Sequence, residues 1–264
     1  SRKKQLLINK KQETKGLRPL QMCTAYNSLF AKLFDPIDDI ILDGDSLNMS
    51  FGGKKDTLSA TLDQMIYHTQ AVCNGAENSF VIADMPFGTY PTAEKALENA
   101  TRVFQESPAD AVKIEGGEEK AHTIQYLVDN GIAVCGHIGL LPQSVRGEGG
   151  YKVKGKTDSE ATQLIADAKA IEKAGAFCVV IEGVKANVAT LVAQAVDVPV
   201  IGIGAGNGVD GQVLVFSDML GLFEEFTPKF VKKYLNGADL VKEAVQNYKD
   251  EVEARSFPDE IHTY

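Results

Sequence analysis

The sequence contains no apolar run that approaches the roughly 20 residues needed for a membrane-spanning helix. Its basic opening, SRKKQLLINKK, is not followed by the apolar core of a signal peptide, so we expect a cytoplasmic protein with no membrane partner. Long polar tracts and biased repeats are also lacking. With 44% apolar and 24% charged residues, the composition is typical of a soluble globular protein and argues against a disordered or fibrous one.

Cysteine is scarce, and the 36 acidic residues outnumber the 27 Lys and Arg. The four cysteines lie far apart and form no CxxC pair, which argues against a zinc or redox site. Cys23, Cys135 and Cys178 fall in apolar, strand-like runs, so we expect reduced thiols in the core. The net charge of -9 comes without the clustered Lys and Arg that neutralise phosphates, so no nucleic-acid partner is expected. GxSxG and Walker sequences are missing, which argues against serine hydrolase and P-loop chemistry.

Short apolar, β-branched runs alternate with amphipathic stretches of about 10 to 18 residues, which is typical of βαβ units and a parallel sheet. Eight is the strand number of the (β/α)8 TIM barrel, a fold that typically takes roughly 250 residues. The 264 residues therefore predict an α/β fold with a single barrel domain over 1–264. The eight expected strands lie at 19–26, 38–44, 79–85, 110–116, 132–138, 176–183, 198–206 and 211–216.

The segments between the strands predict helices and two unusual loops. Start and stop signals for helices are strongest at 61–75, 92–106 and 158–175. The tail at 228–264 predicts a C-terminal extension of one or two amphipathic helices with a loose end. Two loops, at 47–59 and 140–157, are long and rich in glycine, which is typical of active-site loops.

The run IGIGAGNGVDGQ at 201–212 has the GxGxG spacing found in dinucleotide sites. Such a site also needs a long helix directly after the glycines, and none is expected before the next strand. We therefore interpret these glycines as tight backbone packing at the mouth of the barrel.

Polar and charged residues cluster at the carboxyl ends of five consecutive predicted strands. Barrel enzymes assemble their sites from these ends, so the clustering predicts an active site. From the second to the sixth strand, the residues are Asp43, Asp45, Ser46, Asp84, Lys113, Glu115, His137 and Glu182.

Three of these acids, Asp45, Asp84 and Glu115, follow successive strands with few soft ligands nearby. Converging carboxylates suit a hard divalent cation that keeps several waters, which favours Mg²⁺ over zinc. Each acid alone could instead be a helix cap or a turn residue. Lys113 and Glu115 are two positions apart on one strand, so both should face the barrel interior, with a structural ion pair as the alternative.

Glu182 ends the apolar run FCVVIE, where desolvation should raise the pKa of its carboxyl group. A raised pKa makes a carboxylate a better proton acceptor near neutral pH. The alternative is a structural carboxylate satisfied by backbone amides. His137 is either a hydrogen-bonded wall residue or a substrate contact. The remaining histidines, His68, His122 and His262, are expected on helices or the tail and carry no assigned role.

Longer motifs cover most of the chain in order. They are TAYNS at 24–28, GDSLNM at 44–49, TLDQMIYHTQAV at 61–72, ADMPFGTY at 83–90, VKIEGG at 112–117, GHIGLLPQS at 136–144, GGYKVKGK at 149–156, AGAFCVVIEGV at 174–184, IGIGAGNGVDGQVLV at 201–215 and PKFVKKY at 228–234. Together they resemble the ketopantoate hydroxymethyltransferase family, the 3-methyl-2-oxobutanoate hydroxymethyltransferases of pantothenate and coenzyme A biosynthesis.

The resemblance implies a barrel of the phosphoenolpyruvate mutase-like superfamily. Such an enzyme transfers a one-carbon unit from its co-substrate 5,10-methylenetetrahydrofolate to 3-methyl-2-oxobutanoate (2-oxoisovalerate), giving 2-dehydropantoate and tetrahydrofolate. Asp45 and Asp84 would bind Mg²⁺, with Glu115 contributing to the metal site through water, and Glu182 would accept the proton. The family also implies a homo-oligomer, a decamer of two pentameric rings. The residues that would hold the keto acid are Asp45, Ser46, Asp84 and Lys113.

Three departures from the family pattern leave every proposed catalytic group in place. Asn27 stands where Asp is usual, Leu141 stands where Thr is common, and 53–61 lacks a common proline.

Two alternative functions remain open. Lyases of the phosphoenolpyruvate mutase and isocitrate lyase type usually carry a KKCGH-like loop, which this sequence lacks. A non-enzymatic barrel would be favoured by missing acids, but all of them are present.

Overall fold

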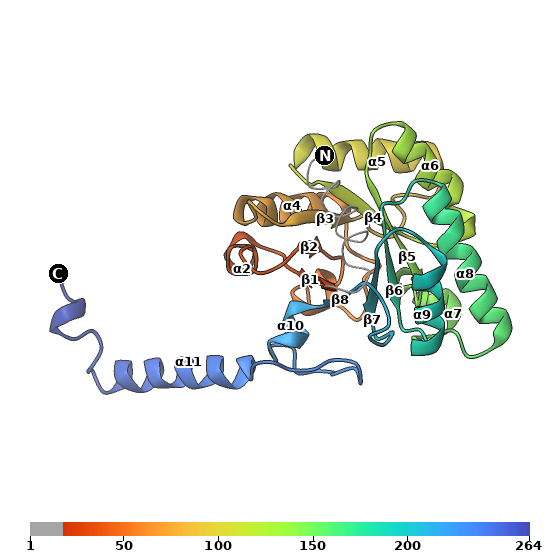
Figure 1. Ribbon diagram of the computed structural model, residues 1–264. Coiled ribbons are helices and arrows are strands. Elements are labelled where there is room, and N and C mark those ends of the chain that lie inside the picture. Colours follow the sequence, from red (N-terminus) through yellow and green to blue (C-terminus); the bar gives the residue numbers. More distant parts are fainter. Residues whose placement is uncertain (1–17) are drawn as a thin grey trace. The chain divides into compact units, whose positions relative to one another are not determined.

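The computed structural model of the chain describes residues 18–264, so the basic opening SRKKQLLINKK lies outside the described residues. Eight parallel strands close into a barrel in chain order, with β1 paired to β8 (Figure 1). The predicted TIM barrel and its eight strands are confirmed, within a few residues at each strand end. The strands are β1 (Leu20–Thr24), β2 (Ile40–Asp43), β3 (Phe80–Asp84), β4 (Ala111–Glu115), β5 (Val134–Gly139), β6 (Cys178–Glu182), β7 (Val200–Ile203) and β8 (Gly211–Leu214).

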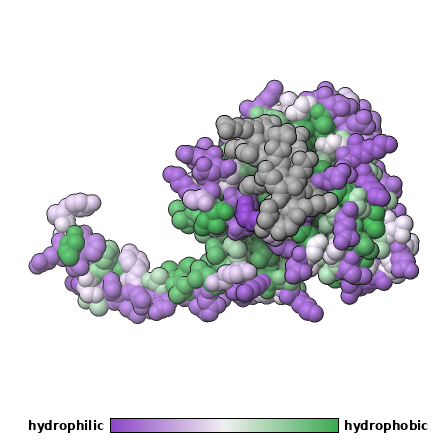
Figure 2. Space-filling view, viewed as in Figure 1, coloured by the Kyte–Doolittle hydropathy of each residue, from purple (hydrophilic) through white to green (hydrophobic). Residues whose placement is uncertain are grey.

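The chain divides into two compact units, one ending at Val215 and the other spanning Phe216–Tyr264. The second unit contains α10 (Phe216–Met219), α11 (Gly237–Glu253) and η3 (Glu260–His262). Helix α11 confirms an amphipathic helix in the tail, and Figure 2 shows hydrophobic and hydrophilic side chains interleaved along it. The single domain over 1–264 stays a prediction.

Between residues 18 and 264, none of the helices combines the length and the apolar character that a membrane crossing demands. The cytoplasmic location stays a prediction. Cys23, Cys135 and Cys178 are buried, as expected for thiols in the core, and Cys73 is partly buried.

Apolar side chains fill the barrel interior below the carboxyl ends of the strands. Phe80 and Ile82 of β3 face this interior, so Asp84, two positions further on, continues the same face. The apolar filling therefore forms a floor beneath the polar strand ends. Its buried members are Leu20, Met22, Ile40, Leu42, Phe80, Ile82, Ala111, Cys135, Phe177, Cys178, Val180, Ile201, Ile203 and Val213.

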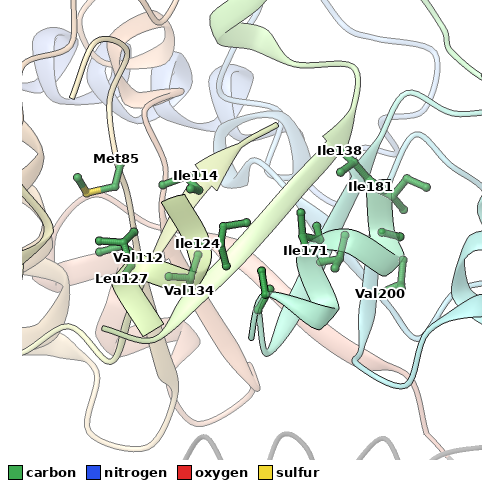
Figure 3. Close-up of a cluster of buried hydrophobic side chains, with 14 of the residues drawn as sticks. Met85, Val112, Ile114, Ile124, Leu127, Val134, Ile138, Ile171, Ile181 and Val200 are labelled. Atoms are coloured by element: carbon green, nitrogen blue, oxygen red, sulfur yellow. The ribbon is translucent and has the colours of Figure 1, made fainter. Parts of the chain in front are cut away.

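Helices surround the strands and bury a second apolar layer between themselves and the barrel (Figure 1). Side chains of α6 and α8, among them Ile124 and Ile171, pack with residues of the neighbouring strands (Figure 3). A Cβ atom added at Gly136 would lie 2.5 Å from Cδ1 of Ile171, so glycine permits this close approach of α8 to β5. The surrounding elements are α2 (Ser28–Phe34), α4 (Leu62–Gly75), α5 (Ala93–Glu106), η1 (Glu118–Lys120), α6 (Ala121–Asp129), α8 (Asp158–Lys173) and α9 (Ala186–Ala195).

The three helices with the strongest start signals, α4, α5 and α8, are confirmed, and each begins directly after a threonine. The hydroxyl of Thr61 accepts from the backbone N–H of Gln64 at 3.2 Å, while the Gln64 side chain accepts from the backbone N–H of Thr61 at 2.9 Å. Thr92 and Thr157 cap α5 and α8 with the same type of side-chain acceptor. These caps satisfy amide donors that would otherwise lack partners at the helix ends.

The two predicted long loops contain short helices. Helix α3 (Leu47–Ser50) follows β2, whereas η2 (Pro142–Ser144) and α7 (Val145–Glu148) follow β5. In the described chain β7 leads to β8 without a helix, as expected. A Cβ atom at Gly208 would lie 2.1 Å from the hydroxyl oxygen of Thr190 on α9, which supports the interpretation of this glycine-rich turn as tight packing.

Candidate active site

Buried charged residues meet at the carboxyl ends of β3, β4 and β5, above the apolar floor. In the strand register Asp84 lies opposite Lys113, and Glu115 lies opposite His137. All four residues are buried. Lys113 and Glu115 share the inward face of β4, as the sequence predicts, so both contribute to one cluster.

The ammonium group of Lys113 contacts two members of this cluster. Its Nζ atom lies 3.0 Å from Oδ1 of Asp84 and 3.0 Å from Nδ1 of His137. Burial by itself would lower the pKa of Lys113, but the charges of Asp84 and Glu115 outweigh burial and raise that pKa. Lys113 therefore keeps its positive charge and can hold an anionic group at the barrel mouth.

His137 lies between Lys113 and Glu182. Burial, and secondarily the charge of Lys113, hold the pKa of His137 well below its usual range, so the imidazole is neutral. An ammonium group only donates, so Nδ1 must be the accepting nitrogen and Nε2 must carry the proton. Nε2 lies 3.0 Å from Oε2 of Glu182. Burial raises the pKa of Glu182 to about 7, as the apolar run before it predicts.

Asp45 and Ser46 reach the same cluster from the loop after β2. The backbone N–H of Asp45 donates to Oδ2 of Asp84 at 2.9 Å. Burial, followed by repulsion from Asp84, raises the pKa of Asp45 to about 7. A Cβ atom at Gly44 would lie 3.0 Å from Oγ of Ser46, so the turn is compact. Oγ of Ser46 lies 2.6 Å from the hydroxyl oxygen of Tyr26.

Two further residues, Gln143 and Tyr90, belong to the cluster although sequence reasoning did not single them out. The side-chain amide of Gln143 donates to Oδ2 of Asp45 at 2.9 Å, and its backbone N–H donates to Oε2 of Glu115 at 3.0 Å. The hydroxyl of Tyr90 donates to Oε1 of Gln143 and accepts from the backbone N–H of Glu115 at 3.2 Å. No local pattern marks either residue, because their partners are distant in the sequence.

Asp43 does not join the cluster, in contrast to the other strand-end residues. It pairs in register with Ala83 on the outward face of the barrel, and its Oδ2 accepts from the hydroxyl of Thr69 on α4 at 2.7 Å. Burial raises its pKa well above the usual range. The alternation of side chains along a strand explains this placement, since Asp43 lies one position after the inward-facing Leu42.

The histidines without an assigned role lie where the sequence places them. His68 is on α4, where its Nδ1 lies 2.7 Å from the carbonyl oxygen of Tyr26, and His122 and His262 are on α6 and η3. Asn27, one of the departures from the family pattern, caps α2 by accepting from the backbone N–H of Phe30 at 2.9 Å. The departure at Asn27 therefore preserves a helix cap.

The donor set suits a hard divalent cation. The pKa values of Asp45, Glu115 and Glu182 are all raised, chiefly by burial, and for Asp45 and Glu115 neighbouring carboxylates add to the rise. A divalent cation would offset that mutual repulsion. Within residues 18–264 no three carboxylate, imidazole or thiol groups form a ready-made cage. A cation bound by two carboxylates and several waters is typical of Mg²⁺ and atypical of structural zinc.

An open pocket of about 680 Å³ adjoins this cluster. Loops after β2, β3 and β5 line it, with Leu58, Phe87 and Arg146 among the lining residues. Gln143 lines the pocket as well, and the same residue binds Asp45 in the charged cluster. One side chain therefore lies between the pocket and the buried acids.

Comparison with known proteins adds to this geometry. The sequence model of the ketopantoate hydroxymethyltransferase family matches residues 4–260. The chain belongs to this family. Proteins named 3-methyl-2-oxobutanoate hydroxymethyltransferase are similar to it over nearly their full length. The one from Sulfurimonas denitrificans is 70% identical and covers 99% of each chain, and the one from Helicobacter pylori is 49% identical and covers 99% of this chain and 97% of its own. The resemblance seen in the sequence, and with it the assignment as a transferase, is confirmed.

Solved structures with low sequence identity share the fold. Phosphonopyruvate hydrolase, solved in a complex with oxalate and Mg²⁺, has a TM-score of 0.64 at 12% identity and covers 98% of this chain and 93% of its own. The structure of 2,3-dimethylmalate lyase, a member of the phosphoenolpyruvate mutase and isocitrate lyase superfamily, has a TM-score of 0.61 at 16% identity. The match covers 96% of this chain and 98% of the lyase. These likenesses agree with the predicted barrel fold.

Proposed function

We propose that the chain transfers a hydroxymethyl group from 5,10-methylenetetrahydrofolate to 3-methyl-2-oxobutanoate in pantothenate and coenzyme A biosynthesis. The products are 2-dehydropantoate and tetrahydrofolate, and water supplies the hydroxyl oxygen because the donor carries a methylene group. Family membership supports the reaction. The observation that carries the mechanism is the position of Glu182, a carboxyl group with a pKa of about 7 that lies 3.0 Å from neutral His137.

The keto acid would lie above the apolar floor, among Asp45, Ser46, Asp84 and Lys113. The charged Lys113 ammonium attracts its carboxylate, and the Ser46 hydroxyl can donate to one of its oxygens. Asp45 and Asp84 would hold Mg²⁺ directly, with Glu115 acting through water. A bound Mg²⁺ supplies Lewis-acid stabilisation of the negative charge that develops on the keto oxygen.

Glu182 would take the proton from C3 of the keto acid. Its raised pKa makes it a stronger base than an ordinary carboxylate, and a pKa of about 7 leaves about half of it ionised at neutral pH. His137 is unsuited to this role because its Nδ1 lone pair accepts from Lys113 and its Nε2 already carries a proton. The electron pair of the C–H bond then forms the new bond to the methylene carbon of the folate, as one of the two carbon–nitrogen bonds of that carbon breaks. Water then replaces the second folate nitrogen on the same carbon and provides the hydroxyl group, and tetrahydrofolate leaves with both nitrogens.

Deuterium uptake at C3 in D₂O, with Mg²⁺ and without folate, tests this base directly. Glu182→Gln should bind the keto acid almost normally yet exchange about 10²- to 10⁴-fold more slowly, the usual contribution of a positioned general base. Glu98→Gln, an exposed change on α5, is the matched control and should exchange like the wild type. Exchange by Glu182→Gln at the wild-type rate would contradict the assignment.

The folate would occupy the open pocket. Its volume of about 680 Å³ falls in the usual range of roughly 300–1,000 Å³ for ligand pockets. Phe87 and Leu58 offer apolar surface to a flat ring system, and Phe87 is 53% exposed. The exposed guanidinium group of Arg146, which pairs with Asp56 at 2.7 Å, would also contact the carboxylates of the glutamate tail.

We further infer that the chain forms a homo-oligomer, the decamer of two pentameric rings that the family resemblance implies. Helix α11 supports an interface between copies, because a row of its apolar side chains is between 44% and 61% exposed. Exposed apolar rows of this kind are typical of surfaces that pack against a partner. The row consists of Leu240, Val241, Val245, Tyr248 and Val252.

A further inference from the structure

Gln143 forms hydrogen bonds with three parts of the candidate site, although the proposed mechanism assigns it no role. It lies in η2, in the loop after β5, and is buried. Its side-chain nitrogen donates to Oδ2 of Asp45 at 2.9 Å and to the carbonyl oxygen of Met85 at 3.0 Å. Its backbone N–H donates to Oε2 of Glu115 at 3.0 Å. One residue thus connects the ends of β2, β3 and β4.

The orientation of the Gln143 amide is fixed by its partners. The carbonyl oxygen of Met85 can only accept, so the amide nitrogen must face it. The amide oxygen is then left for the hydroxyl of Tyr90, which donates to it. Tyr90 is itself held because its hydroxyl oxygen accepts from the backbone N–H of Glu115 at 3.2 Å. A flipped amide would lose the bonds to Asp45 and Met85 and would place its oxygen against both of these acceptors.

We propose that Gln143, held by Tyr90, is a positioning residue that orients Asp45 and Glu115 for Mg²⁺. The inference rests on the proposed function, because it assumes that these acids form the cation site. The amide occupies Oδ2 of Asp45, which leaves Oδ1 as the oxygen for the cation. Partners of this kind, which bind the ligands of a metal without touching the metal, fix the rotamer and the basicity of those ligands.

Titration calorimetry with Mg²⁺ on the metal-free full chain tests the proposal without relying on turnover. Gln143→Met keeps the length of the side chain but removes its hydrogen bonds, so the dissociation constant for Mg²⁺ should rise by about 10- to 100-fold. Tyr90→Phe keeps the buried ring but frees the amide, and should shift the constant in the same direction. Exchange at C3 should recover at saturating Mg²⁺, because the base Glu182 is untouched.

Gln163→Met on α8 is the matched control. Its side-chain nitrogen also donates to two carboxylates, Glu118 at 2.8 Å and Asp167 at 3.0 Å, but this residue is exposed on the outside of the barrel. It should bind Mg²⁺ like the wild type. Thermal unfolding of each metal-free variant separates the roles, since a purely structural residue would lower the midpoint and leave the dissociation constant of the folded protein unchanged.

Two results would overturn the inference. If Gln143→Met and Tyr90→Phe both bind Mg²⁺ within twofold of the wild type, Gln143 does not position the acids, and the proposed cation site stands. If the wild type itself binds no Mg²⁺, both the proposed cation site and the inference about Gln143 are wrong. The wild-type titration therefore distinguishes a failure of the proposed function from a failure of this inference.

Discussion

At the scale of single residues, Glu182 has two properties that favour the removal of a proton from carbon. It ends an apolar strand, and its pKa is raised to about 7 by burial. A protonated carboxyl cannot accept the C3 proton, so exchange at saturating Mg²⁺ should fall about tenfold per pH unit below that pKa and level off above it. The pKa of Lys113 is raised above its usual value, so its charge stays constant over this range. NMR measurement of C3 exchange from pH 5 to 9 checks the profile.

A profile that stays nearly flat down to pH 5, as expected for a glutamate with the ordinary pKa of about 4.3, would contradict this prediction. It would mean that the carboxyl is solvated in the working enzyme, and that burial does not set its basicity.

The charged members of the cluster could be predicted because a strand alternates its faces and barrel strands end together. Asp84, Lys113 and Glu182 follow this rule directly. Gln143 could not be predicted, since its contact with Asp45 spans 98 positions and its residue type is ordinary in a loop. Tyr90 lies 53 positions from Gln143, again without a local signal. Such contacts arise only when the barrel brings separate loops together.

At the scale of elements, the capping box of α4 should be measurable. Thr61→Ala removes the acceptor for the Gln64 amide and should lower the free energy of unfolding by about 0.5–2 kcal/mol. Thr162→Ala, an exposed change inside α8, is the matched control and should be neutral or slightly stabilising. Urea unfolding of both variants makes the comparison. Equal effects of the two changes would show that the cap does not limit stability.

The difference between long, capped helices and short, uncapped ones explains which elements could be predicted from the sequence. Helices α4, α5 and α8 each have a threonine cap and several turns of periodic apolar residues. The local sequence therefore predicts both where each helix begins and which of its faces is buried. Helix α3 and helix α7 have four residues each, too few to display a period. These short helices depend on contacts within their loops, and the sequence indicated only long, glycine-rich connections.

At the scale of the whole molecule, assembly should depend on α11. Sedimentation velocity at micromolar concentration should show the wild type as a species larger than the 28.5 kDa chain. Val245→Asp places an unpaired charge in the apolar row and should shift the protein towards a smaller species. Gln246→Glu adds a charge to the same helix outside that row and is the control. A wild type of 28.5 kDa alone would rule out the oligomer, and an unaffected Val245→Asp would exclude α11 from its interface.

If the proposed function holds, Gln143 would also make the binding of Mg²⁺ and the binding of the folate thermodynamically dependent on each other. The residue lines the open pocket and binds both Asp45 and Glu115, so a folate that fixes the pocket wall also fixes the acids. The free energy of this coupling must be reciprocal: whatever tetrahydrofolate adds to the affinity for Mg²⁺, Mg²⁺ adds to the affinity for tetrahydrofolate. Saturating tetrahydrofolate should therefore tighten Mg²⁺ binding about 5-fold or more in the wild type, and calorimetry on Gln143→Met should find this cooperativity lost.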